Sequence, residues 1–508
     1  MKKIFIIITI LVFLIGCTVQ ETSNQNIIKK QNMNSTAAIS KCGDGICDSK
    51  EKQKNVCPED CGGITPSVKD EPIENQLLSP FGIMAAFEPS TLLDIDTPDK
   101  IAWAGSNFRN LGAKWSREAG ERIIWELIEP TLGTGYDFAD SDEILKNVYA
   151  QGGTGFNMVV VISPSRGKGV SDDILPANEQ YFKNFVKAVV ERYDGDRIDD
   201  ASGNIKVKYW QADNEPFPMK WEDGGGTIDG YVRFVELFNE AVKEADPTAK
   251  IILGTFSFDS AGIADLNRVI PKMKDKDLFD YVDTHNWGKP DNYKISITEA
   301  KSILDSNGYS NAKLVSLEFG TAAERLGVTQ EQQANYLIKG YVYNLAQGFV
   351  LINWNNLVEW SAYGWPQKAA DSVYNFMGLI ADGQNGDSES AGTPRLSYYT
   401  YKLMVEKLEG IDWDNTDESY FDGIYLYGFT KNEKQTWVAW NDNSAEKDIT
   451  LSKLDSTSIK ITEAVPKYEN GKDVTDYSTA FNSEIKSVSN GQVSLTLGDN
   501  PVFVEELN

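Results

Sequence analysis

Two glutamates follow short apolar runs of the chain. Glu215 lies in WQADNEPF and Glu318 in SLEFGT, 103 residues apart (318 − 215). If both runs are strands of one parallel barrel, their carboxyl ends meet at the same face and the two carboxylates share a pocket. One protonated carboxyl that assists a leaving oxygen, beside one ionised carboxylate at an anomeric carbon, is what cleavage of a glycosidic bond requires. The pair therefore predicts acid/base and nucleophilic chemistry on such a bond.

Other chemically capable side chains fall at the ends of predicted strands. They are Arg117 in KWSREAG, Asn214 beside Glu215, His285 and Trp287 in DTHNWG, and Trp354 in NWNNLVEW. Arg117 next to Glu318 would hold that carboxylate ionised. Aromatic rings at a barrel mouth suit the apolar faces of sugars. We expect these residues to bind the substrate.

Each of these residues also has a plainer interpretation. Asn-Glu-Pro can simply begin a helix. Arg117 could form a surface ion pair, the single histidine of the chain could be a buried structural residue, and Trp287 could belong to the core. The positions at strand ends favour the functional interpretation.

The elements that would carry these residues alternate between strand and helix. Helical patterns such as YFKNFVKAVVERY and YVRFVELFNEAVKEA separate the apolar runs. An α/β (β/α)8 TIM barrel fits eight such units better than an open sheet does, and no strand is followed by a glycine-rich phosphate loop. The predicted strands are Phe81–Phe87, Ala113–Ser116, Phe156–Ile162, Val207–Gln211, Ile251–Phe256, Tyr281–Thr284, Lys313–Leu317 and Phe349–Asn353.

After Gly410 the pattern changes to short segments of alternating polarity, such as GIYLYGF, QTWVAWN and QVSLTL. About 100 residues of this kind predict a β-sandwich. The expected domains are a catalytic barrel over 77–410 and a sandwich over 411–508.

The combination of Asn214-Glu215-Pro216 with Glu318 resembles the clan A glycoside hydrolases, over roughly residues 77–410 and with a C-terminal sandwich as in several of its families. The resemblance implies a retaining TIM-barrel enzyme in which Glu215 is the acid/base and Glu318 the nucleophile. It also implies that Asn214 hydrogen-bonds the sugar's 2-hydroxyl and that Trp354 lies under the sugar.

The segment WSREAG…WELIEPTLGTGYDF is similar to the second βα unit of families near 39 and 5, where a strand-two arginine often occupies the place of Arg117. Family 5 enzymes usually have a histidine near the end of strand three and His-x-Tyr after strand six. This chain has VVVISPSRG and His285-Asn286-Trp287 there. The departure leaves the family open, and with it the residue that would hydrogen-bond the nucleophile.

The N-terminus has the features of an export signal. Lys2 and Lys3 precede an uncharged run from Ile4 to Ile15, which is shorter than the ~20 apolar residues of a membrane span. The run ends in LIGC, which resembles the lipobox of bacterial-type lipoproteins. The resemblance implies a lipoprotein signal over residues 1–17 in which cleavage before Cys17 makes this cysteine the lipidated new N-terminus. An ordinary secretory signal or an uncleaved anchor is the alternative. We expect an exported protein that is lipid-anchored at the cell surface or secreted.

Four of the five cysteines form a compact module. An even set in an exported chain predicts two disulfides, for which three pairings are possible. Interspersed acidic residues leave a calcium site open, whereas the cysteine spacing is not a familiar zinc pattern. The module lies in a polar tether over 18–76, and its cysteines are Cys42, Cys47, Cys57 and Cys61.

Charge excludes several partner classes. The 508 residues include 49 Lys and Arg against 75 Asp and Glu, a net charge of −26. Such a chain is repelled by nucleic acid and by anionic lipid headgroups, so we expect contact with a membrane only through the anchor at Cys17. A single histidine also excludes a three-histidine metal site. The expected protein is a monomer that needs no metal or organic cofactor.

The sequence therefore predicts a retaining glycoside hydrolase acting on a poly- or oligosaccharide. Three alternatives are a carbohydrate-binding surface lipoprotein without turnover, a transglycosylase with the same two glutamates, and a purely architectural lipoprotein. The sugar, its linkage and exo or endo action stay open.

Overall fold

The computed structural model describes most of the chain from residue 78 onward. All described residues belong to one compact unit, Ser67–Asn508. The predicted signal, the tether, Cys17 and the cysteine module lie outside the described residues. The described ranges are 78–87, 98–118, 123–163, 179–217, 226–257, 259–275, 277–288, 294–323, 327–359, 376–383, 388–431 and 434–507.

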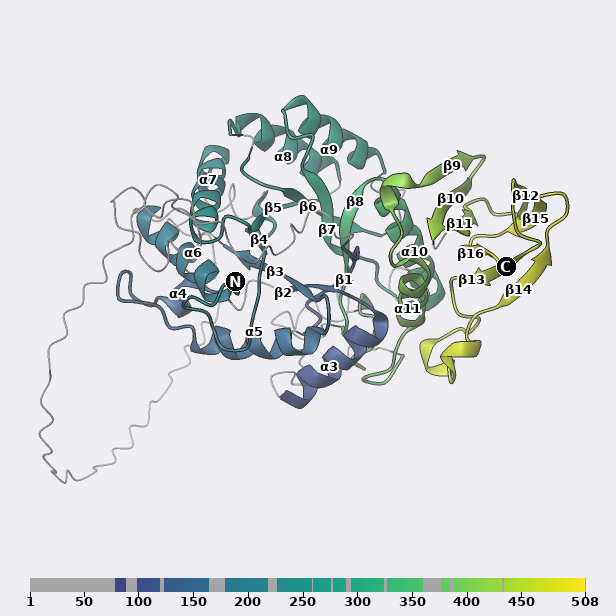
Figure 1. Ribbon diagram of the computed structural model, residues 1–508, viewed down its shortest axis with the longest axis horizontal. Coiled ribbons are helices and arrows are strands. Elements are labelled where there is room, and N and C mark those ends of the chain that lie inside the picture. The colour runs from purple at the N-terminus through teal and green to yellow at the C-terminus, as the bar shows by residue number, and fades with distance from the viewer. Residues whose placement is uncertain are drawn as a thin grey trace, which may run out of the picture. The chain divides into compact units, whose positions relative to one another are not determined.

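Eight parallel strands close into a barrel in chain order, from β1 to β8 and back to β1 (Figure 1). This confirms the predicted TIM barrel. Each observed strand overlaps a predicted one, although β2, β6, β7 and β8 continue two or three residues further at their carboxyl ends. The bounds are β1 Phe81–Met84, β2 Trp115–Glu118, β3 Asn157–Ile162, β4 Tyr209–Ala212, β5 Lys250–Ser257, β6 Tyr281–Trp287, β7 Lys313–Gly320 and β8 Phe349–Asn355.

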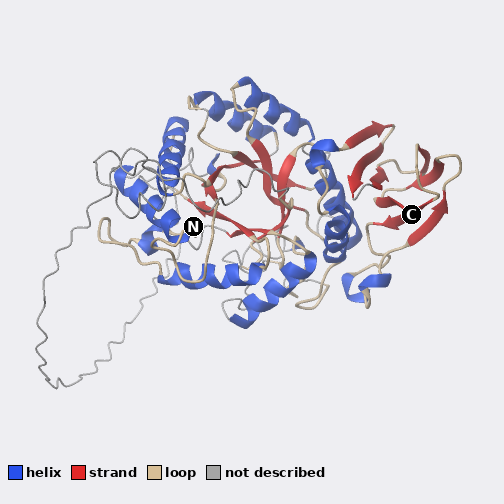
Figure 2. Cartoon of the chain, in the orientation of Figure 1, coloured by secondary structure: helices blue, strands red, loops and turns tan. Residues whose placement is uncertain are grey.

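Helices cover the outside of the barrel, as Figure 2 shows. In α7 the buried residues Tyr231, Val235, Phe238 and Val242 recur every three or four positions and form one apolar face. Among the described residues, no helix combines the length and the apolar character needed to cross a bilayer. The bounds are α3 Pro98–Leu111, α4 Trp125–Ile128, α5 Ala139–Gly152, α6 Glu179–Tyr193, α7 Ile228–Ala245, α8 Ser260–Val269, α9 Lys294–Ser306, α10 Gln330–Ala346 and α11 Leu396–Leu408.

The barrel interior is a packed core and not a channel. Inward side chains of β2 to β8 form one apolar cluster, which includes Trp115, Tyr209, Val315, Leu317 and Leu351. Toward the carboxyl ends of the strands the inward side chains become polar. The apolar cluster therefore supports a polar layer on which the candidate site is built.

The C-terminal part is a β-sandwich, as predicted. A six-stranded antiparallel sheet in the order β14-β13-β16-β11-β10-β9 accompanies a two-stranded sheet of β12 and β15. The bounds are β9 Asp417–Phe421, β10 Ile424–Lys431, β11 Lys434–Asn441, β12 Lys447–Ser452, β13 Ser458–Glu463, β14 Ser483–Ser487, β15 Gln492–Leu497 and β16 Val502–Glu506.

Alternation along β10 shows how this sheet is buried on both faces. Tyr425 and Tyr427 point to one side and join the large core that contains the barrel helices. Ile424 points to the other side and joins the core formed with Leu451 of β12 and Leu495 of β15. The six-stranded sheet is therefore packed between the barrel and the small sheet, which explains its apolar content on both faces.

Gly254 in β5 allows a close approach that shapes the end of β4. A Cβ atom at this position would lie 2.2 Å from the carbonyl oxygen of Ala212 and 2.5 Å from that of Asp213. Both neighbours are backbone atoms and cannot rotate away. Any larger residue must push the end of β4 outward.

We therefore expect Gly254→Ala to lower the free energy of unfolding by about 1–3 kcal/mol, the usual cost of overpacking a rigid site. Chemical denaturation monitored by circular dichroism measures this. Gly498→Ala is the matched control, because a Cβ there would meet no atom within 4 Å. Equal stability of the two variants would contradict the steric argument.

Candidate active site

Glu318 reaches the barrel interior through an irregularity in β7. Val315 and Leu317 both belong to the inner cluster, so strict alternation would turn Glu318 outward. The pairing of β6 with β7 shifts between Asp283 and His285, whose partners are Val315 and Glu318. Two steps along β6 thus face three along β7. This bulge re-aims the Glu318 side chain inward.

Arg117 of β2 donates hydrogen bonds to three polar side chains at the carboxyl end of the barrel. Its Nη1 donates to Glu318 Oε1 at 2.8 Å, its Nη2 to Asn214 Oδ1 at 2.6 Å, and its Nε to Gln211 Oε1 at 2.6 Å. Arg117 is 1% exposed. The predicted neighbourhood of Arg117 and Glu318 is therefore observed, and the fixed guanidinium geometry orients an amide and a carboxylate at once.

Glu215 lies in a sharp turn after β4. Asp213 and Glu215 have φ values of +67° and +46°, a region that non-glycine residues rarely adopt and that occurs preferentially at functional sites. Asp213 Oδ1 accepts hydrogen bonds from Ser163 Oγ and the Asn214 amide, both at 2.9 Å, and so fixes the turn. The Glu215 side chain is 43% exposed, against 10% for Glu318.

His285 lies among the carboxylates. Its Nδ1 is 2.8 Å from Glu215 Oε1, and its Nε2 lies 3.4 Å from Asp283 Oδ2 and 3.5 Å from Glu318 Oε1. Burial alone would lower the pKa of the imidazole, but the charges of Glu318 and Asp283 and the hydrogen bonds raise it to about 10. The histidine is therefore a cation at neutral pH, with Nδ1 in hydrogen-bond contact with Glu215 and Nε2 facing the carboxylates of Asp283 and Glu318.

The two glutamates face a common space. One carboxylate oxygen of Glu215, one of Glu318 and one nitrogen of His285 all lie within 4.8 Å of one another. The structure thus brings together Arg117, Asn214, Glu215, His285 and Glu318 from β2, β4, β6 and β7.

Sequence reasoning missed a polar layer beneath these residues. Gln211 Nε2 donates to Asp283 Oδ2 at 2.8 Å, and Thr255 Oγ1 donates to the same oxygen at 2.7 Å. All three side chains are buried. The sequence signal for this layer was the presence of polar residues inside apolar strands. Asp283 also lies two positions before His285 and therefore on the same face of the strand.

The tryptophans differ in their placement. Trp287 is half-buried, packs edge-on to His285 with ring centroids 6.1 Å apart, and contacts the small cluster of Ala322, Phe376 and Met377. It therefore lies beside the site.

Trp354 does not join the site, in contrast to its expected place under the sugar. It is 0% exposed, packs edge-on to Phe319 and donates its indole N–H to the Met377 carbonyl at 2.8 Å. From Leu351 of the inner cluster, alternation along β8 turns Asn353 inward, against Gly82, and so turns Trp354 outward into the core between strands and helices.

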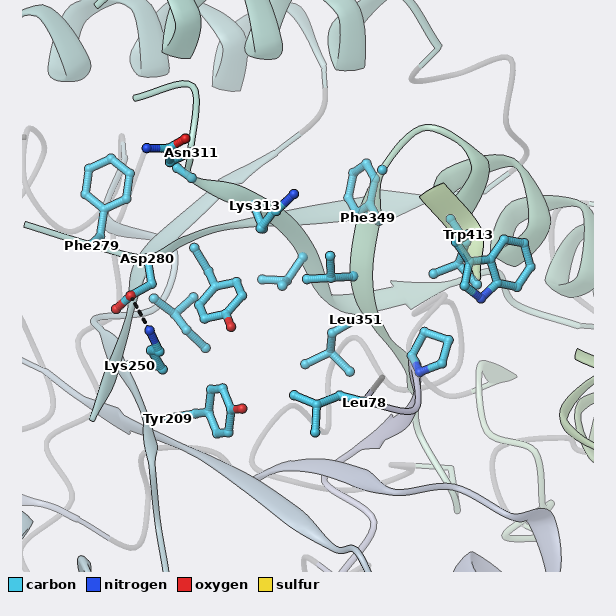
Figure 3. Close-up of a pocket in the computed structure, with 18 of the residues that line it drawn as sticks. Leu78, Tyr209, Lys250, Phe279, Asp280, Asn311, Lys313, Phe349, Leu351 and Trp413 are labelled. Carbon is cyan, nitrogen blue, oxygen red and sulfur yellow. Dashed lines mark hydrogen bonds and ion pairs between the residues drawn. The ribbon is translucent and has the colours of Figure 1, made fainter. Parts of the chain in front are cut away.

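A cavity of about 870 Å³ lies at the opposite end of the barrel (Figure 3). Its lining includes Tyr209, Tyr281, Lys313 and Phe349, which are the first residues of β4, β6, β7 and β8. Lys250 and Asp280 form an ion pair in its wall. Because chemistry in this fold is found at the carboxyl ends of strands, this cavity is not the candidate site.

A second acidic group lies away from the site. Carboxylate oxygens of Asp194, Asp196 and Asp200, in the turn after α6, lie within 4.8 Å of one another. Oxygen ligands of this kind suit a hard cation. They also accept hydrogen bonds from backbone amides of the same turn.

Comparison with known proteins rests on structure. No protein-family model matches the sequence, and no match is found among curated proteins. A GH39 β-xylosidase from Caulobacter crescentus aligns with a TM-score of 0.55 at 13% identity, over 85% of this chain and 96% of that one.

Two further solved structures align similarly. A glucosidase from Croceicoccus marinus gives a TM-score of 0.54 at 14% identity, over 86% of this chain and 97% of that one. A GH30 endoxylanase from Clostridium papyrosolvens C71 gives 0.51 at 13% identity, over 85% and 97%. At these identities the likeness establishes the fold: the chain shares that of these glycoside hydrolases along most of its length.

The charge state of His285 gives a direct pH prediction. Because the chain has one histidine, histidine labelled with ¹³C and ¹⁵N in a protein without a histidine tag gives one imidazole signal. We expect imidazolium shifts at pH 7 and a midpoint near pH 10. A midpoint of about 6.5, the value of a free histidine, would contradict the buried ion network.

The raised pKa of His285 also makes the stability of the fold depend on pH. The pKa of His285 is higher in the folded than in the unfolded chain, so its contribution is fully present below about pH 6.5 and is lost as the pH rises toward 10. Denaturation at pH 7 and pH 9.5, compared between the parent and His285→Asn, measures this. The difference in unfolding free energy between the two proteins should shrink at the higher pH.

Proposed function

We propose that the chain is a retaining glycoside hydrolase in which Glu318 is the nucleophile and Glu215 the general acid/base. The observation that carries the proposal is the pair of carboxylates with oxygens within 4.8 Å of each other at the carboxyl end of the barrel. Retaining enzymes separate their carboxyl groups by about 5–5.5 Å, whereas inverting enzymes need about 6.5–9.5 Å to admit a water. The short separation supports retention.

The environments of the two glutamates support the assignment of roles. Glu318 is nearly buried, and its ion pair with the permanent cation Arg117 at 2.8 Å fixes the carboxylate in the pocket, as a nucleophile requires. Glu215 is far more exposed and can exchange protons with water between the two steps. Asn214 Oδ1 accepts from Arg117, so its amide nitrogen is the group that can donate to a sugar hydroxyl.

The reaction then has two balanced steps. Glu318 attacks the anomeric carbon, the bond to the leaving oxygen breaks, and the proton of Glu215 passes to that oxygen. In the second step a water attacks the same carbon, Glu215 takes one of its protons, and the bond to Glu318 breaks. The sugar leaves with its anomeric configuration retained and both carboxyl groups return to their first state.

The substrate class follows from the neighbours by analogy. They include the β-xylosidase, the glucosidase and a family 51 α-L-arabinofuranosidase from Bifidobacterium longum. We therefore propose that the substrate is an oligo- or polysaccharide, and that the three corresponding aryl glycosides form the first panel.

Hydrolysis of this panel by the full-length chain and its variants tests the proposal. Glu318→Gln should reduce release of the aryl group to background. Glu215→Gln should cost about 10²–10⁴-fold, the usual contribution of general acid/base catalysis, and less for leaving groups that need no proton. Glu240→Gln on the surface is the control, since Glu240 pairs only with Lys183 among the ion pairs found.

The stereochemistry of the first product separates the mechanisms. Proton NMR during turnover should show the anomer of the substrate before mutarotation. Formation of the opposite anomer would exclude Glu318 as a nucleophile.

We also propose that the protein is exported and anchored through a lipid on Cys17. The support is the sequence alone, namely the short apolar run that ends in LIGC. Bacterial cells fed with radiolabelled palmitate should label the parent chain and not Cys17→Ser. Equal labelling of both would exclude this anchor.

A further inference from the structure

Asp283 is a carboxylate with no exposure to solvent, placed below the candidate site. It belongs to β6 and points to the same face as His285, two residues further along. A buried charge of this kind is costly unless donors surround it. Its contacts therefore show what it holds in place.

Four groups converge on this carboxylate from four strands. Oδ2 accepts from Thr255 Oγ1 of β5 at 2.7 Å and from Gln211 Nε2 of β4 at 2.8 Å, and lies 3.4 Å from His285 Nε2 of its own strand. Oδ1 accepts from the Leu317 amide of β7 at 2.9 Å. The residues that contact the carboxylate are all buried.

The contact with Leu317 lies at the bulge that re-aims Glu318. Leu317 immediately precedes Glu318, and the register between β6 and β7 shifts at this place. A bulge leaves a backbone group without its ladder partner, and here the amide of Leu317 is satisfied by Asp283. The carboxylate thus stabilises the irregular backbone that directs Glu318 inward.

The contact between Asp283 and His285 affects Glu215 indirectly, because the imidazole lies between the two carboxylates. Burial alone would raise the pKa of Asp283, but the His285 charge, hydrogen bonds and Arg117 lower it, so Asp283 is ionised. The charged groups around the imidazole are Asp283, Glu318 and Glu215, with Arg117 behind Glu318.

We propose that Asp283 is a positioning residue for both glutamates: its carboxylate faces Nε2 of the His285 imidazolium, whose Nδ1 contacts Glu215, and it holds the β7 bulge that presents Glu318. This inference rests on the proposed hydrolase function for its consequence in catalysis, and on geometry alone for its effect on His285.

The arrangement assigns the protons of the site. Imidazolium Nδ1–H donates to Glu215 Oε1, so the proton that Glu215 transfers belongs on Oε2. With Glu215 protonated, two cations, Arg117 and His285, balance two anions, Asp283 and Glu318. Loss of the charge at residue 283 would leave His285 with one anion fewer, and the imidazole would release its proton at lower pH.

The test is Asp283→Asn, which keeps the shape and removes the charge. The single histidine signal of the folded, substrate-free protein should show a midpoint lowered by about one to three pH units, the usual effect of one neighbouring charge. In turnover, kcat should fall by at least about 10-fold with a smaller change in KM. The alkaline limb of the kcat profile should move to lower pH together with the histidine midpoint.

Thr284→Val is the matched control. Thr284 is equally buried on the opposite face of β6 and donates one hydrogen bond, to the Val315 carbonyl at 3.1 Å. Its loss should lower stability without moving the histidine midpoint or the pH profile. If Asp283→Asn does not fold, Asp283→Ser removes the charge with a smaller side chain and answers the same question.

The outcomes separate this inference from the proposed function. An unchanged histidine midpoint in a folded Asp283 variant overturns the inference, whatever the activity of the parent. A lowered midpoint with a parent that cleaves no glycoside supports the geometric part and counts against the hydrolase. A lowered midpoint with an unchanged kcat profile overturns the role of Asp283 in catalysis.

Discussion

The site depends on one buried ion pair. Arg117 and Glu318 meet at 2.8 Å with side-chain exposures of 1% and 10%, and removal of one partner from such a pair costs about 3–5 kcal/mol. Burial is tolerated because the guanidinium also donates to Gln211 and Asn214. One arginine therefore ties β2 to β4 and β7, so the positions of the candidate nucleophile and of the residue beside the acid/base are set by the same group.

Irregular backbone around this pair is what makes the geometry possible. The turn after β4 contains two residues of positive φ, and β7 carries an extra residue relative to β6. Regular strands would have turned Glu318 into the helical layer. Gly254 permits the first irregularity and Asp283 satisfies the freed amide of the second. The buried polar layer therefore stabilises the irregular backbone as well as orienting the candidate catalytic side chains.

The architecture was predictable from the sequence because it follows from local periodicity. Apolar runs separated by amphipathic helices specify a parallel barrel, and alternating segments after Gly410 specify a sandwich. The grouping of Arg117, Asn214, Glu215, His285 and Glu318 was also predictable, since the carboxyl ends of barrel strands meet at one face. These inferences need only the order of elements.

The orientation of individual side chains could not be predicted, because it depends on which face of its strand each residue occupies. Trp354 was expected at the sugar because it follows an apolar run, yet its neighbour Asn353 is the residue that points inward. Alternation counted from Leu351 would have corrected Trp354, but the same rule applied to β7 from Leu317 would have removed Glu318 from the site. The bulge between Val315 and Glu318 changes the outcome in β7, and the amide of Leu317 within it donates to Asp283 on a neighbouring strand. Because that contact joins residues 34 positions apart, no local pattern encodes it, and the inward face of Glu318 follows only from the three-dimensional pairing of β6 with β7.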